Sequence, residues 1–407
     1  MTTDAVHRRN ARVYLLGLAA SLIGSSAMTL VAGIWVKSLT GSSSAAALVA
    51  VCIYAPSLLS PAAGLLVDRV RRRRLLVVVN LASAAALLPL LLVDSAGRVW
   101  LIYAAMLAYG ISLVLVDPAE NALFAVMLPG DVRRRMNGLR LALQEGGKLV
   151  APLLGAGLYV LLGGGAVAAV DAATFVLAAF AMTRLRFDEP KPRPARRHWR
   201  TELVAGLGHI RAVPVLRSTT LAAAVAMIVA GFATGAQYAL VDALHRPPSF
   251  LGVLTGLLGA GSIVAGLVSG RLVRRVGERR LAVLGLANGT LGYLLYLTGL
   301  TPTALVGAFV LGFALPWTVV ALINLAQRTT PDDLQGRVSA AVTLALFAPQ
   351  PAAHALGAFA IATIDFRTVY ISAAAVTLSA ALWLSRRSDA SETRGNRGDS
   401  PCVGVAK

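Results

Sequence analysis

The segment Gly64-Leu-Leu-Val-Asp68-Arg69-Val-Arg-Arg-Arg-Arg74 has a counterpart later in the chain, Gly270-Arg-Leu-Val-Arg274-Arg275-Val-Gly-Glu-Arg-Arg280. Each segment follows an apolar stretch, and the two lie 206 residues apart in a chain of 407 residues. A second pair, Pro129-Gly-Asp131 and Pro331-Asp-Asp333, recurs at an offset of 202 residues. Matches at such similar offsets indicate that one unit occurs twice. A repeated membrane unit is a transporter architecture, with the substrate site expected near the bilayer midplane between the halves.

Twelve apolar stretches of membrane-spanning length surround these segments, six in each half of the chain. A spanning helix needs about 20 mostly apolar residues. Hydrophobic residues make up 57% of the chain and charged residues only 14%. The sequence therefore predicts an all-α membrane protein with twelve transmembrane helices in two six-helix bundles. The predicted helix cores are 13–36, 44–67, 75–93, 99–128, 136–162, 166–182, 219–240, 251–273, 281–300, 304–326, 338–363 and 369–384.

Lys and Arg residues are concentrated in alternate connections. Of the 38 such residues, 32 lie in the N-terminus, in the connections after every second stretch, and in the C-terminal tail. Four lie in the other connections and two lie inside a stretch. By the positive-inside rule, this asymmetry predicts a multi-pass protein of the inner (plasma) membrane with both termini in the cytoplasm. The same placement argues against nucleic acid as a partner, despite a net charge of +19.

The chain divides around a basic, proline-containing connection. We predict an N-terminal bundle over residues 1–184, a cytoplasmic linker over 185–212, a C-terminal bundle over 213–386, and a disordered cytoplasmic tail over 387–407.

The linker contains apolar residues at helical spacing, among them Leu203, Leu207 and Ile210. Charged and polar residues separate them, which is the pattern of an amphipathic helix. We expect this helix to lie at the cytoplasmic membrane surface and to end before Pro214.

Together these motifs resemble those of a known family. The 64–74 segment is similar to the signature of the loop between the second and third helices in the major facilitator superfamily. Further stretches resemble one branch of that family, which contains macrolide-efflux and enterobactin-exporter proteins. These stretches are Leu39-Thr-Gly-Ser42, Pro56 to Pro61, Asn137-Gly138, Gly206 to Ile210, Pro214 to Arg217, Gln327 to Pro331 and Gly336 to Val338. The resemblance covers nearly the whole chain. It implies a secondary active exporter that alternates between inward and outward openings, usually driven by protons.

The resemblance also implies a conformational latch at Gly64, Asp68, Arg69 and Arg337. In the family the glycine lets the second and eleventh helices approach, and the acid interacts with the N-terminal end of the eleventh. An acid near a helix N-terminus is stabilised by about 0.3 to 1 kcal/mol. The alternative is that Asp68 only balances nearby arginines. The second copy has Arg274 where the acid would be.

Ionisable residues inside the fourth and fifth stretches are the main site candidates. An uncompensated charge near the bilayer centre costs about 2.5 to 3.5 kcal/mol or more, so such residues are functional candidates by default. The candidates are Asp117, Glu120, Asn121, Arg140, Gln144, Glu145 and Lys148. At about 1.5 Å rise per residue, Asp117 and Lys148 lie roughly 15 to 18 Å deep. We expect Lys148 to pair with Asp117 or Glu145; the alternative role for these charges is a structural salt bridge between the two helices.

Polar residues in the C-terminal half are fewer. The substrate-cavity candidates there are Gln237, Tyr238, Trp317 and Asn324, with Gln350 and His354 as further cavity-lining residues. Each could instead be a hydrogen-bonded packing residue. Asp171 and Asp242 lie nearer the predicted outer surface, where we expect them to be hydrated. The GxxxG-spaced glycines Gly252, Gly256, Gly266 and Gly270 are expected to pack closely against another helix.

Motifs of other function classes are absent from the sequence. Gly147-Lys148 lacks the glycine and the Ser or Thr of a phosphate-binding loop, so no ATP site is expected. No catalytic, metal-ligating or cofactor motif is present either. The membrane architecture and these absences predict a transporter and not an enzyme, and the family resemblance implies a monomer that exports amphiphilic small molecules by proton antiport. Uptake of a small metabolite and a non-transporting membrane sensor are the alternative functions.

Overall fold

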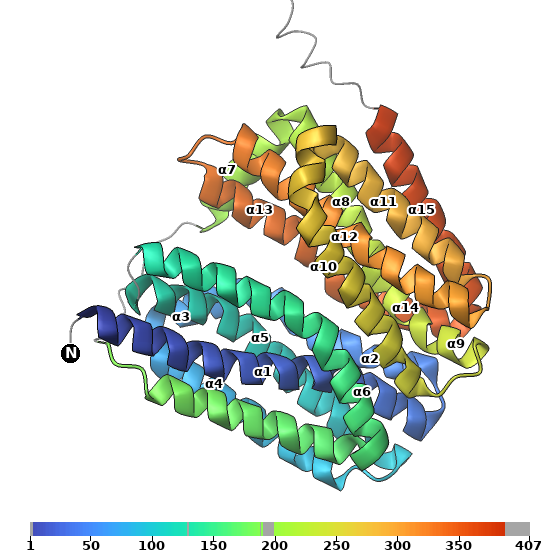
Figure 1. Ribbon diagram of the computed structural model, residues 1–407, viewed down its shortest axis with the longest axis horizontal. Helices are drawn as coiled ribbons and strands as arrows, with labels where there is room; N and C mark the ends of the chain where they lie inside the picture. Colours follow the sequence, from blue (N-terminus) through green and yellow to red (C-terminus); the bar gives the residue numbers. More distant parts are fainter. Residues whose placement is uncertain (1–2, 128–129, 188, 190–198, 387–407) are drawn as a thin grey trace, which may run out of the picture.

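The computed structural model describes residues 3–127, 130–187, 189 and 199–386, and it consists of two helical bundles (Figure 1). The N-terminal bundle contains α1 (Thr3–Thr40), α2 (Ser43–Tyr54), η1 (Ala55–Leu59), α3 (Ser60–Arg69), α4 (Arg72–Leu87), η2 (Leu88–Leu92), η3 (Ala96–Arg98), α5 (Val99–Met127) and α6 (Gly130–Thr183). The C-terminal bundle contains α7 (Trp199–Ala212), α8 (Pro214–Thr234), α9 (Ala236–Ala243), η4 (Pro248–Phe250), α10 (Leu251–Val276), α11 (Glu278–Tyr296), α12 (Thr301–Thr329), α13 (Gln335–Phe347), α14 (Gln350–Thr363) and α15 (Phe366–Arg386).

The predicted all-helical membrane fold is confirmed, but the count of twelve spans is not confirmed as such. Across the described residues, nine helical segments are long and apolar enough to cross a membrane. The fifth and sixth predicted cores both lie in α6, which is interrupted at Gly163, where φ is +80°. The second core is divided into α2, η1 and α3 around Pro56 and Pro61, because proline lacks a backbone donor and clashes with the preceding turn.

The sequence repeat corresponds to a repeated contact. Arg73 Nε donates to the carbonyl of Met182 at 3.0 Å, at the end of α6. Arg279 Nε donates to the carbonyl of Leu384 at 2.8 Å, near the end of α15. The two arginines are separated by the same 206 residues as the repeated segments. Each binds the C-terminal carbonyls of the last helix in its bundle, where unpaired carbonyls and the helix dipole favour a cation.

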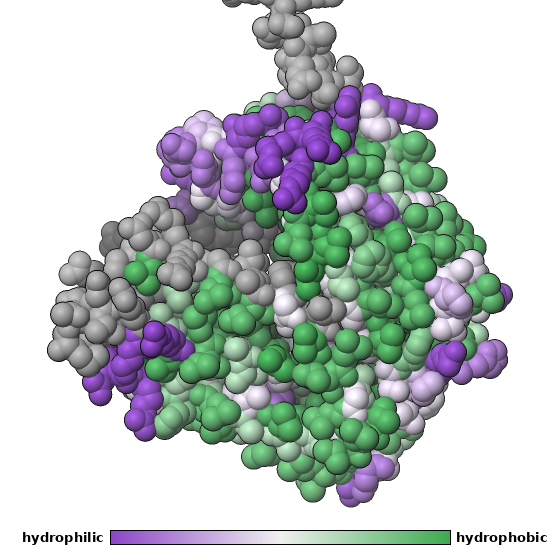
Figure 2. Space-filling model, in the orientation of Figure 1, coloured by the Kyte–Doolittle hydropathy of each residue, from purple (hydrophilic) through white to green (hydrophobic). Residues whose placement is uncertain are grey.

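The surface has an apolar belt between two polar ends. Figure 2 shows the purple, hydrophilic residues mainly at the top and lower left, with smaller purple areas at the right edge and the bottom and green surface between them. We call the end that carries Arg72, Arg73, Arg274 and Arg386 the basic end. The end that carries the α1–α2 turn at Gly41 is called the opposite end.

The two bundles touch at the opposite end and diverge toward the basic end (Figure 1). Contacts along one face of α10 change in the same direction. A Cβ added to Gly252 would lie 2.4 Å from Ala156 of α6, whereas a Cβ added to Gly270 would meet nothing within 4 Å. Residues 18 apart lie on the same side of a helix because 18 residues complete five turns. The predicted glycine packing is therefore present only in the first part of α10.

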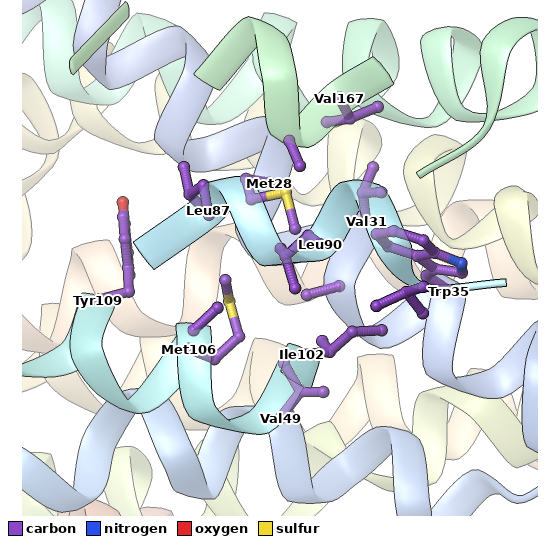
Figure 3. Close-up of a cluster of buried hydrophobic side chains, with 14 of the residues drawn as sticks. Met28, Val31, Trp35, Val49, Leu87, Leu90, Ile102, Met106, Tyr109 and Val167 are labelled. Atoms are coloured by element: carbon purple, nitrogen blue, oxygen red, sulfur yellow. The ribbon is translucent and has the colours of Figure 1, made fainter. Parts of the chain in front are cut away.

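The apolar cores follow the same division. One cluster fills the N-terminal bundle and includes Met28, Leu90, Ile102 and Val167, which converge from α1, η2, α5 and α6 (Figure 3). A second cluster includes Ile34 of α1 together with residues of the C-terminal bundle such as Leu240. The contact between bundles at the opposite end is therefore an apolar core and not only a polar surface contact.

The amphipathic helix of the linker is present as α7, and α8 begins at Pro214. It packs against other helices of the C-terminal bundle. Ile210 is buried among residues of α8, α12 and α13, and a Cβ at Gly206 would lie 2.3 Å from the carbonyl oxygen of Arg337. His209 Nε2 lies 3.1 Å from the carbonyl oxygen of Thr329. The apolar face of α7 thus covers the start of α13.

Candidate functional site

A charged cluster joins α5 to α6 inside the N-terminal bundle. Arg140 on α6 donates to Asp117 Oδ1 at 2.6 Å and to Asn121 Oδ1 at 2.9 Å. The same guanidinium lies 3.4 Å from Glu120 Oε2. Arg140 and Glu120 are buried, at 9% and 6% exposure. One arginine is therefore shared by two carboxylates and an amide.

Helix periodicity explains why these α5 residues meet one guanidinium. Residues three and four apart lie on one helix face, which brings Asp117, Glu120 and Asn121 to the same side of α5. Asp117 lies ten residues before the end of α5, and Arg140 lies ten residues after the start of α6. Each is therefore about 15 Å along its helix from the connection between them. The cluster lies at mid-depth.

A third helix contributes Tyr14 to this cluster. The ring of Tyr14 packs edge-on against Phe124 with centroids 4.5 Å apart. Its hydroxyl is close to the Glu120 carboxylate but makes no hydrogen bond of standard geometry. Arg140 Nε is also buried without an acceptor. Donors thus surround the Glu120 carboxylate, and some of them have no acceptor in this conformation.

The Asp117 carboxylate differs from that of Glu120 in its access to solvent. Its side chain is 70% exposed, although it lies at mid-depth in the helix. A charge facing lipid at this depth would be costly, so we interpret its open side as facing the space between the bundles. With both acids ionised, the three charged groups sum to −1. This cluster could therefore hold one proton or one cationic group.

The structure brings together four of the seven predicted residues in this region. The side chains of Gln144, Glu145 and Lys148 lie outside the described residues, so the predicted Lys148 pairing is untested. The described partner of Asp117 is Arg140, a candidate residue for which the sequence indicated no partner. The equal distances of Asp117 and Arg140 from the connection were a signal for this pair.

The C-terminal candidates are spread over different places. Gln237 lines a cavity of about 230 Å³ enclosed by α8, α10, α11, α12 and α15. Tyr238 extends into the N-terminal bundle, where its hydroxyl lies against Gly33 of α1. Trp317 Nε1 donates to the carbonyl of Ala265 at 3.1 Å and so joins α12 to α10. Asn324 is partly buried on α12.

A second cavity of about 290 Å³ lies between α8, α12 and α13, in the half of the C-terminal bundle nearer the basic end. Its lining is mostly apolar and includes Ile323, Val342 and Phe347, with Gln327 and Thr343 as polar members. Such a surface can hold the apolar part of a ligand while offering it a few hydrogen-bonding groups.

Polar contacts between the bundles were not predicted. Lys37 Nζ, at the end of α1, lies 2.5 Å from Asp242 Oδ2, at the end of α9. Tyr54 of α2 stacks on His354 of α14 with centroids 4.4 Å apart.

Gln350, one turn before His354, donates to the carbonyl of Met227 at 3.0 Å. Gln350 and His354 are therefore packing residues in this conformation, which is the alternative role that the sequence allowed them.

Asp171 and Asp242 were expected to be hydrated near the outer surface. Asp171 has 0% exposure, because it faces the Gly24 backbone of α1. Asp242 is half exposed but paired with Lys37. The exposure of Asp242 agrees with the expected hydration, whereas the burial of Asp171 contradicts it, because sequence distance from a predicted helix end does not reveal which way a side chain points.

Comparison with known proteins identifies the family. A sequence model described as Major Facilitator Superfamily matches residues 13–241 and 219–403. The chain belongs to this superfamily. The first match covers the N-terminal bundle and continues into α9, and the second covers the C-terminal bundle from within α8 onward.

Three proteins illustrate the similarity, each at low sequence identity. Macrolide efflux protein A of Streptococcus pyogenes is 22% identical over 334 residues, covering 79% of this chain and 82% of that protein. Among solved structures, a bacterial homologue of the iron transporter ferroportin in an inward-facing state aligns with a TM-score of 0.69 at 16% identity, covering 93% and 99% of the two chains. A D-xylose-proton symporter aligns with a TM-score of 0.69 at 15% identity, covering 94% and 98%. The structural likenesses show the fold alone.

The described residues of the predicted latch make no close contact with one another or with a neighbouring helix at Gly64. A Cβ added to Gly64 would meet nothing within 4 Å, so no helix packs closely there. Arg69 and Arg337 are exposed, and the Asp68 side chain lies outside the described residues. This is the arrangement expected when the bundles are apart at the basic end, and the latch stays a prediction for the opposite conformation.

Proposed function

We propose that this transporter is a secondary active exporter of amphiphilic small molecules, such as a drug, a macrolide-like natural product or a siderophore, and that it exchanges them for protons. The observation that carries the proposal is the Asp117–Arg140 pair, which holds an exposed carboxylate at mid-depth in the N-terminal bundle. An ionisable group in that position is costly and is retained where it serves a pathway.

The basic end faces the cytoplasm in this proposal, with both termini on that side of the inner (plasma) membrane. The distribution of Lys and Arg supports this orientation. The conformation is then open to the cytoplasm and closed by the Lys37–Asp242 pair at the outer end and, about three helical turns deeper, by the Tyr54–His354 stack. A substrate or a proton would reach Asp117 from the cytoplasm in this state.

Proton exchange would occur at the two carboxylates that share Arg140. While both are ionised, the cluster carries an excess negative charge that attracts a proton or a cationic substrate. Binding of a proton to either acid neutralises this excess, and the two occupants then compete. Because the proton and the substrate cannot occupy the cluster together, each binds only after the other has left. The protein therefore carries the two in opposite directions across the membrane.

The C-terminal bundle would supply the apolar surface for an amphiphile. The cavity near Phe347 and the enclosed cavity at Gln237 are mostly apolar, with a few amide and hydroxyl groups. The likeness to a macrolide efflux protein supports export of a large amphiphile. A D-xylose-proton symporter has the same fold, so the fold is compatible with proton coupling. We propose that the transporter acts as a monomer in the lipid bilayer, without ATP.

Transport in inverted membrane vesicles tests the substrate class and the direction. Vesicles that contain the protein would be given an acidic interior, and macrolides, siderophores and cationic dyes would be added outside in turn. We expect at least one amphiphile to accumulate in a manner that a protonophore abolishes. Accumulation only in right-side-out vesicles would show uptake instead. No gradient-dependent movement of any compound, with the protein correctly inserted, would favour a non-transporting sensor.

A further inference from the structure

Asp171 is a buried acid that the site described above does not use. It lies on the second part of α6, eight residues after the break at Gly163 and twelve before the helix ends at Thr183. These intervals place it about 12 Å and 18 Å from the two ends of that part. Its exposure is 0%. It is therefore deep in the N-terminal bundle and away from water in this conformation.

The Asp171 carboxyl group has almost no polar partners. Thr174 Oγ1 donates to Oδ1 at 3.1 Å, whereas Oδ2 accepts no hydrogen bond. Among the ion pairs of the described residues, none includes Asp171. An ionised carboxylate removed from water needs a cation or several donors. The uncharged carboxylic acid is the form that these surroundings accommodate.

Gly24 of α1 keeps water away from this acid. A Cβ at Gly24 would lie 2.6 Å from Asp171 Oδ1 and 2.6 Å from Thr174 Oγ1. Both oxygens are therefore pressed against the α1 backbone, in space that a side chain would otherwise fill. The close contact also fixes the carboxyl group beside the next residue of α1, Ser25.

Several hydroxyl groups lie near the Asp171 carboxyl group, and one of them belongs to an exposed residue of α1. Ser25 lies beside the Asp171 carboxyl group. The Tyr109 hydroxyl lies near Ser25, Thr29 and Asp171, while its ring packs on Phe175 and occupies one edge of the apolar cluster in Figure 3. Thr29 is exposed. The neighbouring elements thus contribute hydroxyls, and Tyr109 is the titratable group among them.

We propose that Asp171 is a second proton-binding residue of the transport cycle, protonated in the conformation open at the basic end and connected to the space between the bundles through Ser25, Tyr109 and Thr29. The inference rests on the proposed function, because it assumes that protons drive transport. Only a proton moves: it leaves the carboxyl oxygen along these hydroxyls to water at Thr29, and a carboxylate remains. Asp117 differs because its charge is already paired with Arg140.

Infrared spectroscopy of the purified protein tests the inference without any substrate. The wild type at neutral pH should show a carboxylic-acid carbonyl band that Asp171→Asn removes. The matched control Asp365→Asn, which changes an exposed acid in a connection, should retain it. As the pH is raised, the band should give way to carboxylate absorption. Absence of the band at neutral pH, or a band that persists unchanged at alkaline pH, would overturn the inference. The wild-type titration does not depend on folding of the variant.

Transport supplies the second measurement. Because asparagine has the shape of the neutral acid, Asp171→Asn should insert normally, lose about tenfold or more of gradient-driven efflux, and keep exchange that needs no gradient. Normal gradient-driven efflux by this variant would make Asp171 a structural acid and overturn the inference. Failure of the proposed function is a different result: the wild type itself would show no gradient-driven transport, whatever the infrared band does.

Discussion

The Lys37 ammonium group lies 2.5 Å from the Asp242 carboxylate, and this ion pair joins the end of α1 to the end of α9 across the two bundles. Lys37 also donates to the carbonyl of Gly41 at 2.7 Å and to Ser43 Oγ at 3.0 Å. The ammonium group therefore has three acceptors and is almost fully buried. Breaking this contact would be one of the costs of opening the protein at this end.

A disulfide across the same contact should stop the cycle. A Cβ added to Gly235 would lie 3.0 Å from the Cβ of Ala47, slightly less than the usual disulfide separation of about 3.5–4.5 Å, so a small shift allows a bond. With Cys52 and Cys402 replaced by serine, A47C with G235C should crosslink on oxidation and lose substrate efflux, and a reductant should restore it. The single variants are the controls. Full efflux by the crosslinked protein would contradict alternating access at this contact.

Two glycines on one face of α10 should affect the conformational equilibrium in opposite directions. Gly252→Val would clash with Ala156 where the bundles touch, so it should favour opening at the opposite end. Gly270→Val lies on the same face where α10 has free space, so it should hinder closure of the basic end. Alkylation of single cysteines placed in each opening measures the two states. Equal shifts for both variants would contradict the inferred movement.

Removal of the shared cation should destabilise the charged cluster. Arg140→Gln would leave the buried Glu120 without its cation, and breaking a buried ion pair in this way costs about 3–5 kcal/mol. We expect a clear loss of thermal stability in detergent. Adding Glu120→Gln should recover much of it, because the unpaired charge is removed. Two losses that simply add would mean that Arg140 and Glu120 are not energetically coupled.

Reporter fusions test the orientation. A reporter active only outside the cytoplasm should be silent when fused near Arg72, Arg197 or Arg394 and active near Thr40 or Pro247. The reason is the concentration of Lys and Arg on one side of the membrane. An active fusion at Arg197 would reverse the orientation, and with it the assignment of this conformation as open to the cytoplasm.

Local sequence features predicted the fold more fully than the site. The repeated segments at Gly64 and Gly270 indicated two equivalent bundles, and the matching contacts of Arg73 and Arg279 agree with that repeat. The helices could be predicted because apolar length is a local property. The break of the second core near Pro56 and the non-helical Gly163 between the fifth and sixth cores were not located from the sequence, since backbone geometry and not hydropathy sets those breaks.

Side-chain partners depend on tertiary contacts that sequence spacing does not specify. Asp117, Glu120, Asn121 and Arg140 were candidates from their depth and charge alone, and spacing did not show that one guanidinium would join the other three residues. The predicted pairing of Lys148 with Asp117 or Glu145 stays untested. The Lys37–Asp242 pair joins residues 205 apart, so no helical periodicity could have found it. Asp171 was judged by its distance from a helix end, whereas its burial results from rotation toward Gly24.

The most direct test of the central claim is a paired measurement of proton and substrate flux in proteoliposomes, with Asp117→Asn compared with the wild type. Once a transported amphiphile is known, an imposed proton gradient should drive its accumulation by the wild type, with protons moving in the opposite direction. Asp117→Asn should lose about tenfold or more of this gradient-driven accumulation and keep substrate exchange at zero gradient. Asp94→Asn, in an exposed connection, should behave as the wild type. Undiminished proton-driven accumulation by Asp117→Asn would contradict the account.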